Sequence, residues 1–327
     1  MNPGPGPSDP LHAERTTTLR VIATGGAGFI GSHVVDRLIT DGHEVAVVDD
    51  LSTGARANVN AAARLHVTDI RGPDLLRIVD ATRPDAVVHL AAQAAVSRSV
   101  ADPVFDASVN ILGMLNLLEA CRSAGVRNVV YISTGGAAYG DTDVVPTPES
   151  HLTRPASPYG VSKVAAELYL DCWAGLHGAR GVSLRLANVY GPRQNPEGEA
   201  GVVAIFTRRL LSGRACVING DGEQTRDYVY VGDVADAVVR ALTRVSATGA
   251  INVGTTRETT VNEIFRLLAR AAGVDRPAEH GPARPGEQRR SALAWERAGR
   301  LLDWEPRTPL DRGLADTVGW SRAHGGA

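Results

Sequence analysis

The sequence is poor in cysteine and carries no excess of charge of either sign. Its 327 residues include three cysteines, Cys121, Cys172 and Cys216, which are scattered and odd in number. Such a set predicts neither a disulfide framework nor a zinc cluster, so no metal site is expected. The formal net charge is -2. A nucleic-acid surface would need a clustered excess of Lys and Arg, so no nucleic-acid partner is expected.

Long apolar runs and targeting signals are also missing. No run approaches the ~20 residues of a membrane span, and no membrane association is expected. Residues 1–18, MNPGPGPSDPLHAERTTT, contain prolines and polar residues but no apolar core of a signal peptide. We predict a disordered leader over 1–18 and a location in the reducing cytoplasm.

What the chain has instead is a regular alternation of strand-like and helix-like patterns. Short apolar runs that indicate buried strands occur at 19–24, 43–50, 85–92, 127–134 and 181–191. Helical spacing separates them, which predicts an α/β fold with a Rossmann-type, doubly wound parallel sheet. After Gly191 the pattern loosens into loops rich in Gly, Pro and Arg, with shorter helices at 201–212, 260–272 and 309–322.

This change of pattern divides the chain into two lobes. We predict a first domain over 19–190, rejoined by about 227–253, where the sequence YVYVGDVADAVVRAL returns to it. Residues 191–226 and 254–327 are expected to form a smaller C-terminal α/β lobe that binds substrate.

A glycine-rich turn follows the first predicted strand. In ATGGAGFIGSH, Gly25, Gly28 and Gly31 stand between that strand and a helix, where they permit a tight turn and close approach of the backbone to a pyrophosphate. Asp49 ends the second strand, 18 residues beyond Gly31, where a carboxylate can accept hydrogen bonds from the adenosine ribose. The same carboxylate would repel a 2′-phosphate, so NAD is favoured over NADP. Asp69 follows the third strand and could reach the adenine.

A tyrosine and a lysine four residues apart indicate the chemistry. In SPYGVSKVAAE, Tyr159 and Lys163 share one face of a predicted helix, so the ammonium can lie beside the phenol. Such a pair usually works with a third hydroxyl. The stretch YISTGGAAYG, residues 131–140, offers Ser133 and Thr134 for that role at the end of a predicted strand.

Taken in order, these motifs resemble the extended short-chain dehydrogenases/reductases. The resemblance is carried by the glycine turn, HLAA, Asn110 in ASVNILGMLNLLEA, the Tyr159–Lys163 pair and LRLANVYGPRQ. Within that superfamily, NPEGEAGVVAIF, GDGEQTRDYVYVGDVADA and RPGEQRRS are similar to the bacterial UDP-galactose (UDP-glucose) 4-epimerases. The resemblance spans roughly residues 19 to 322.

This resemblance implies an NAD-dependent 4-epimerase that acts on UDP-glucose and UDP-galactose, and also on UDP-N-acetylglucosamine and UDP-N-acetylgalactosamine, through a 4-keto intermediate. A UDP-glucuronate 4-epimerase is the alternative, with Arg193 meeting the carboxylate. A non-catalytic NAD-binding sensor is an alternative of another class. The resemblance also implies a homodimer, in which helices 104–124 and 158–175 of two subunits form a four-helix bundle.

The resemblance assigns roles to residues as well. Tyr159 is the base, its pKa lowered by Lys163 and by the oxidised nicotinamide. The family usually has its third hydroxyl at the position of Gly135, so we expect Thr134 to replace it, with Ser133 in reserve. Related 4,6-dehydratases have an Asp–Glu pair after the hydroxyl, and Gly135 and Gly136 therefore disfavour dehydration. The residues implied for NAD binding are Gly25, Gly28, Phe29, Ile30, Gly31, Asp49, Asp50, Asp69, Ile70, Leu90, Ala91, Ala92, Asn110, Tyr159 and Lys163.

The substrate residues follow in the same way. Arg226 and Arg284 match positions that hold the diphosphate, a task that suits a guanidinium. Asn188 matches a position that bonds the diphosphate and sugar, and Glu287 one that bonds the uridine ribose. Others implied for the substrate site are Val203, Asn219 and Ser291. Asn219 stands where the family commonly has an aromatic that stacks on uracil, which leaves another nucleotide open. Ser291 stands where a residue walls the pocket beside the sugar's C2 substituent.

Overall fold

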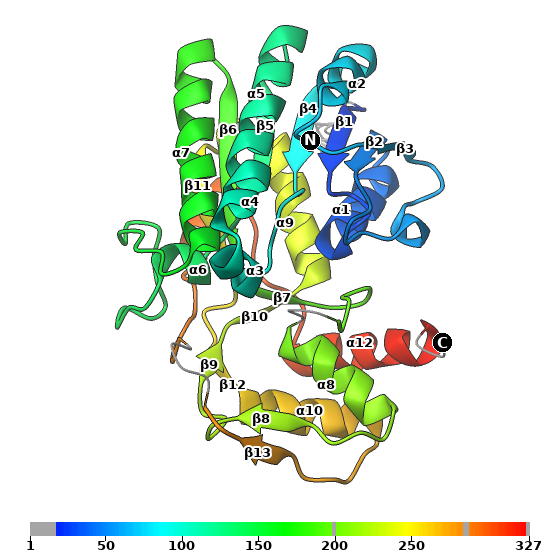
Figure 1. The fold of residues 1–327 in the computed structure, drawn as a ribbon, viewed down its shortest axis with the longest axis vertical. Coiled ribbons are helices and arrows are strands. Elements are labelled where there is room, and N and C mark those ends of the chain that lie inside the picture. The colour runs from blue at the N-terminus through cyan, green and yellow to red at the C-terminus, as the bar shows by residue number, and fades with distance from the viewer. Residues whose placement is uncertain (1–17, 198–200, 284–287, 325–327) are drawn as a thin grey trace, which may run out of the picture.

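A computed structural model of the chain describes residues 18–197, 201–283 and 288–324 (Figure 1). Its centre is a seven-stranded sheet in the order β11-β6-β5-β4-β1-β2-β3, with all neighbouring strands parallel. The strands are β1 (Arg20–Thr24), β2 (Glu44–Asp49), β3 (Arg64–Val67), β4 (Ala86–His89), β5 (Asn128–Thr134), β6 (Arg180–Leu186) and β11 (Gly249–Val253). The order reverses between β1 and β4, so a crevice opens at the carboxyl ends of these strands. The predicted doubly wound parallel sheet is confirmed.

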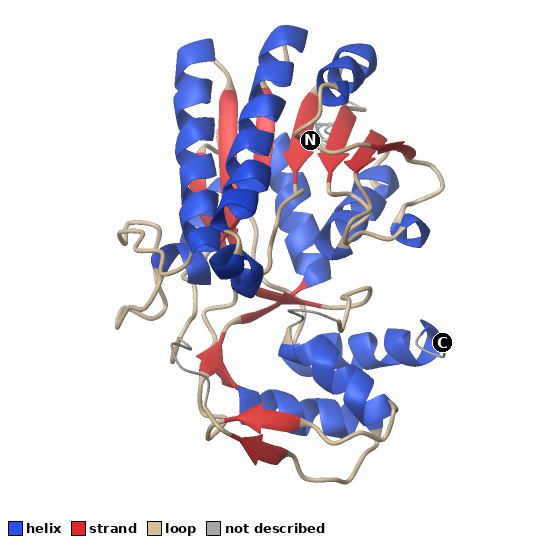
Figure 2. Cartoon of the chain, in the orientation of Figure 1, coloured by secondary structure: helices blue, strands red, loops and turns tan. Residues whose placement is uncertain are grey.

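Helices cover both faces of this sheet (Figure 2). One face carries α2 (Asp74–Thr82), α5 (Gly113–Ala124) and α7 (Pro158–His177); the other carries α1 (Phe29–Thr40), α9 (Val231–Thr243) and α11 (Glu296–Leu302). Successive strand residues point to opposite faces, so each face has its own apolar core. In β1, for example, Val21 and Ala23 belong to the core under α1 and α9, whereas Ile22 belongs to the other.

The smaller lobe lies beyond the carboxyl ends of the sheet strands (Figure 1). Its helices are α8 (Val202–Leu211), α10 (Val261–Ala272) and α12 (Leu310–His324), close to the three predicted positions. Three short strand pairs complete it: β7 (Asn188–Tyr190) with β10 (Tyr228–Tyr230), β8 (Val217–Asn219) with β13 (Glu279–Gly281), and β9 (Thr225–Arg226) with β12 (Thr259–Thr260). A third apolar core holds these elements together.

One helical stretch corrects an expectation. The 22 residues of Pro103–Ala124 are long and apolar enough, by length and composition alone, to cross a membrane, whereas we expected no such run. The stretch consists of α4 (Pro103–Ala107), a π-helical turn η2 (Ser108–Leu112) and α5. Its inner side chains, among them Met114 and Leu117, pack into the core shared with α2 and α7. It is therefore a core helix of the α/β fold, with one apolar face buried against the protein.

Candidate active site

The loop between β1 and α1 depends on glycines. Gly25 has a φ of +70°, and a Cβ there would lie 2.5 Å from a backbone nitrogen of the loop after β4. A Cβ on Gly31 would lie 2.1 Å from the Gly25 carbonyl oxygen, whereas one on Gly28 would meet nothing closer than 3.2 Å. The unpaired N–H groups at the start of α1, from Phe29 and Ile30, are therefore open to an anion. These residues fit the pyrophosphate of NAD.

The carboxylate that ends β2 is tied to this loop. Asp49 is buried, and its two oxygens accept hydrogen bonds from the N–H groups of Ala27 (2.9 Å) and Leu51 (2.8 Å). Burial raises the pKa of Asp49, and the two backbone N–H groups oppose that rise. A carboxylate has about four acceptor positions, so two remain for ribose hydroxyls. Asp50 is exposed and accepts from both the backbone and the hydroxyl of Ser52.

Asp69 and Ile70, both predicted to bind NAD, behave differently. Asp69 is paired with Arg71, and the hydrogen bond from that guanidinium holds the pKa of Asp69 below its usual range. Ile70 is buried and packs so closely under Gly113 that a Cβ there would lie 2.6 Å from the Ile70 Cδ1 atom. Ile70 therefore supports the fold beside the site.

Asn110, predicted to bind NAD, is joined to the chain through both of its side-chain atoms. Its carbonyl oxygen accepts from the Gln93 N–H at 2.9 Å, and its amide donates to the Gln93 carbonyl, to Asp106 and to the Ser162 hydroxyl. These bonds fix the loop after β4, which contains Leu90, Ala91 and Ala92, against the catalytic helix. Asn110 thus supports the predicted NAD site indirectly, because it holds this loop in place.

The catalytic pair lies at the start of α7. Ser157 caps this helix by accepting the Gly160 N–H at 3.2 Å, and Pro158 occupies the first helical position, where a missing N–H does no harm. Tyr159 and Lys163 follow one turn apart. This spacing, predicted from the sequence, brings both side chains to the carboxyl end of β5.

Lys163 is 3% exposed, and its ammonium donates to the Ile132 carbonyl oxygen at 2.6 Å. It also lies 4.3 Å from the centre of the Tyr131 ring. Burial lowers the pKa of Lys163 to about 7, and the negative charges of Glu167 and Asp106 act in the opposite direction. The charge state of this ammonium therefore depends on the acids around it.

The pKa of Tyr159 differs from our expectation. Burial raises it to about 12; a hydrogen bond from Thr134 lowers it, and the charge of Asp106 raises it. Lys163 alone does not bring about the predicted decrease. In the chain without NAD the phenol is therefore protonated at neutral pH.

The structure distinguishes the two predicted hydroxyls. Ser133 donates to Glu167 at 2.5 Å, and Glu167 also accepts from Arg185 at 2.6 Å, so this serine belongs to a buried ion-pair network. Thr134 instead bonds the phenol oxygen of Tyr159. The geometry favours Thr134 as the third hydroxyl.

The glycines after Thr134 make room for another segment. A Cβ on Gly135 would lie 2.4 Å from the Leu293 Cδ1 atom, and one on Gly136 would lie 3.3 Å from the Ser291 hydroxyl. A serine or threonine at Gly135 would therefore collide with Leu293. Ser291 lies beside the same turn, next to Gly136.

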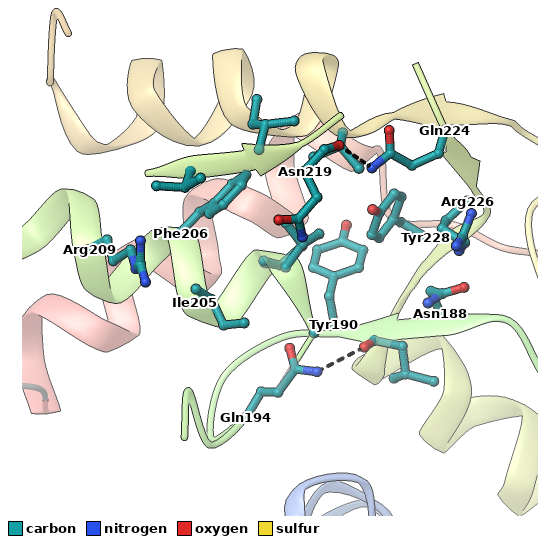
Figure 3. A pocket seen from close by; sticks show the side chains of 17 residues that line it. Asn188, Tyr190, Gln194, Ile205, Phe206, Arg209, Asn219, Gln224, Arg226 and Tyr228 are labelled. Atoms are coloured by element: carbon teal, nitrogen blue, oxygen red, sulfur yellow. Dashed lines mark hydrogen bonds between the residues drawn. The ribbon is translucent and has the colours of Figure 1, made fainter. Parts of the chain in front are cut away.

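A cavity of roughly 370 Å³ opens in the smaller lobe, between α8, β7, β8 and β10 (Figure 3). Four of the predicted substrate residues line it: Asn188, Val203, Asn219 and Arg226. Among residues 18–197, 201–283 and 288–324, no group of three or more His, Cys, Asp or Glu side chains could hold a metal ion. Arg284 and Glu287, also predicted for the substrate, lie outside the described residues.

Several residues that line the cavity were not predicted. They are Tyr190, Gln194, Phe206, Arg209, Gln224 and Tyr228. The two tyrosines occur within NVYGPRQ and DYVYVGD, motifs that could have suggested them. Phe206 is the last residue of the motif NPEGEAGVVAIF, whereas Arg209 lies three residues further along α8, outside that motif. The cavity is thus lined by aromatic side chains although position 219 is an asparagine.

Arg193 is the residue that was expected to meet the carboxylate of UDP-glucuronate, the alternative substrate. Its guanidinium lies 2.7 Å from the Asp36 carboxylate on α1, and the neighbouring Pro192 carbonyl oxygen is hydrogen-bonded to His33 at 2.9 Å. These contacts join the loop after β7 to the helix of the glycine turn. Because Arg193 is already paired with an acid, it is poorly placed to bind the carboxylate of a glucuronate.

The fold and the site define a class of protein. Residues 21–254 match the model of the NAD dependent epimerase/dehydratase family. The chain belongs to this family, and the predicted use of NAD is confirmed.

Comparison with individual relatives gives more specific information than the family match does. The chain is 47% identical over 309 residues to the UDP-glucose 4-epimerase of Mycolicibacterium smegmatis, an alignment that covers 93% of this chain and 99% of the relative. It is similar to the crystal structure of the Thermotoga maritima UDP-glucose 4-epimerase with UDP-glucose, with a TM-score of 0.90, 47% identity and coverage of 93% and 99%. It is also similar to a UDP-N-acetylglucosamine 4-epimerase from Methanobrevibacter ruminantium, with a TM-score of 0.90, 34% identity and coverage of 94% and 100%.

Proposed function

We propose that this protein is an NAD-dependent UDP-hexose 4-epimerase that interconverts UDP-glucose and UDP-galactose. The observation that carries the proposal is the hydrogen bond of Thr134 with the Tyr159 phenol, one helical turn from the buried Lys163. The relatives named as UDP-glucose 4-epimerases support the choice of sugar nucleotide.

Different residues of the chain perform different parts of the proposed reaction. Tyr159 takes the proton from the C4 hydroxyl of the sugar and returns it later, while Thr134 holds the reacting oxygen in place. Bound NAD would supply a hydride acceptor and donor for C4 and a positive charge that would favour the phenolate of Tyr159. The cavity lined by Asn188, Asn219 and Arg226 binds the nucleotide, so the sugar can turn over while the diphosphate stays in place.

The direct test is incubation of the protein with UDP-glucose, followed by chromatography of the sugars. We expect UDP-galactose to form. UDP-N-acetylglucosamine and UDP-glucuronate are tested in parallel. Conversion of UDP-glucuronate alone would favour the alternative epimerase, and bound NAD without conversion of any sugar would favour a sensor.

Thr134→Val should lower turnover about 10-fold or more, within the range for loss of a positioned catalytic hydrogen bond. Valine keeps the shape of threonine but cannot bond the phenol of Tyr159. Steady-state kinetics on UDP-glucose measure the effect, with Ser133→Ala as the matched control. If Thr134→Val has no effect and Ser133→Ala does, Ser133 is the third hydroxyl.

Ser291 is proposed to set the breadth of substrates. It is small, 8% exposed and adjacent to Gly136, so an N-acetyl group could fit beside it. We expect activity on UDP-N-acetylglucosamine as well as UDP-glucose. Ser291→Tyr should suppress the N-acetyl substrate by ~10-fold or more and spare UDP-glucose, because a steric clash selects against the larger group. Equal kcat/KM ratios for the two sugars before and after the change would exclude Ser291 as the gate.

A homodimer is part of the proposal. Helix α7 packs beside α4 and η2, and these neighbouring elements expose large apolar side chains, among them Val104, Leu112, Val161, Leu168 and Leu176. Exposed apolar side chains on neighbouring helices are typical of an interface, and a second copy of the chain could cover them with the same helices. Analytical ultracentrifugation should give about twice the 34.4 kDa chain mass, and a monomer at micromolar concentration would contradict it.

The division of labour and the location are also proposed. We assign residues 19–190 with about 227–253 mainly to NAD, and 191–226 with 254–327 mainly to the nucleotide sugar. The exceptions are β7 and β10, which line the nucleotide cavity, and α11, which packs on the large sheet. Cys121 and Cys216 are buried free thiols and Cys172 is an exposed one, which suits a reducing cytoplasm.

A further inference from the structure

A buried acid on α4 is linked, through the Asn110 amide and the Ser162 hydroxyl, to the Tyr159 backbone carbonyl on α7. Asp106 is 1% exposed, and its Oδ1 atom accepts from the side-chain amides of Gln93 (2.9 Å) and Asn110 (3.1 Å). Its Oδ2 atom is buried and has no hydrogen-bond partner in the described part of the chain. A carboxylate placed in this way interacts strongly with nearby ionisable groups, because little water screens it.

Among the described residues, three other ionisable groups near Lys163 are neutral or paired with an opposite charge. On β4, burial lowers the pKa of His89 to about 3, so its ring is neutral. On β5, burial raises the pKa of Tyr131 well above its usual value, so it is neutral too. The charge of Glu167 on α7 is balanced by Arg185 on β6 at 2.6 Å.

Asp106 differs because no arginine balances it in the described part of the chain. Its charge raises the pKa of Tyr159 and of Lys163 alike. A negative charge favours the protonated form of both groups, which helps to keep the ammonium charged in a site where burial opposes it.

We propose that Asp106 is a positioning residue for catalysis, whose uncompensated negative charge sets the pH range in which Tyr159 and Lys163 work together. The kinetic readout of this proposal rests on the proposed epimerase activity. Activity should rise with pH as the Tyr159 phenol loses its proton and fall as Lys163 loses its own. Removal of the negative charge lowers both pKa values, so both limbs of the profile should move in the same direction.

Asp106→Asn tests the proposal because asparagine has the same shape and its oxygen can still accept from Gln93 and Asn110. We expect the whole pH profile of kcat to shift toward acid by about one unit. The control Asp80→Asn changes an exposed acid on α2 and should leave the profile in place. A lower kcat with both limbs unmoved would mean a merely structural role and would overturn the proposal.

A second measurement does not need turnover. The ultraviolet absorbance of tyrosinate is titrated in the NAD-loaded protein, and the titration of Tyr159→Phe is subtracted to isolate Tyr159. In Asp106→Asn the midpoint should fall by about one unit even if no UDP-sugar is converted, which separates this proposal from the proposed function. Asp106→Ser, which also removes the charge, should move the midpoint in the same direction. An unchanged midpoint in whichever variant folds and binds NAD would overturn the proposal.

Discussion

Tyr159→Phe is expected to lower kcat by roughly 100- to 10,000-fold, the usual contribution of a general acid–base group. The change removes the oxygen that receives the proton and leaves the ring in place, so it opens no cavity. The lost hydrogen bond with Thr134 should change the free energy of unfolding by only about 1 kcal/mol. Steady-state kinetics, NAD binding and thermal unfolding measure the three effects.

A matched control lies on the same helix. Tyr169→Phe makes the identical change at an exposed tyrosine ten residues further along α7, and its kinetics should equal those of the wild type. Wild-type rates in Tyr159→Phe would refute the mechanism. Loss of folding or of NAD binding in that variant would instead assign Tyr159 a structural role.

Gly31→Ala is expected to weaken NAD binding by roughly 10- to 100-fold, which corresponds to about 1–3 kcal/mol of overpacking. The new Cβ would lie 2.1 Å from the Gly25 carbonyl oxygen, a distance that no real contact allows. The glycine turn and the start of α1 must therefore move apart, which displaces the N–H groups of Phe29 and Ile30 from the backbone of the turn that would share the pyrophosphate with them. Calorimetric titration of the NAD-free protein with NAD measures the loss.

Gly319→Ala is the matched control for this change. Gly319 lies on α12, and a Cβ there would meet nothing within 4 Å. Alanine should stabilise that helix by about 0.5–1 kcal/mol and leave NAD affinity unchanged. NAD binding by Gly31→Ala equal to that of Gly319→Ala would contradict the assigned role of the turn.

Two features of the site could be predicted from the sequence because each depends on neighbours along the chain. The glycine turn needs only a strand, a helix and the small residues Gly25, Gly28 and Gly31 between them. The Tyr159–Lys163 pair needs only one helical turn. The alternation of strands and helices likewise predicted the parallel sheet, because parallel strands require helical crossovers.

The resemblance to a known family extended the prediction to the substrate-binding residues. It assigned Asn188, Val203, Asn219 and Arg226 to the substrate, and the fold gathers all four around one cavity. Arg209 was missed because it approaches this cavity from α8, and no local pattern distinguishes a side chain that faces a cavity from one in a core.

Only the tertiary structure distinguishes between side chains that are chemically alike and adjacent in the sequence. Ser133 and Thr134 are adjacent and chemically alike, but Glu167 engages the first and Tyr159 bonds the second. Leu293, 158 residues further along the chain than Gly135, fills the space where a hydroxyl would otherwise stand.

The sequence alone predicted the sheet, the NAD turn and the Tyr159–Lys163 pair, since these follow from the order of residues within one or two elements. The tertiary structure decided which of the two hydroxyls contacts Tyr159, the paired state of Arg193 and the buried position of Asp106. These properties depend on distance and burial among segments far apart in the chain. Electrostatic energies rise as water is excluded, and only the packed fold determines where that happens.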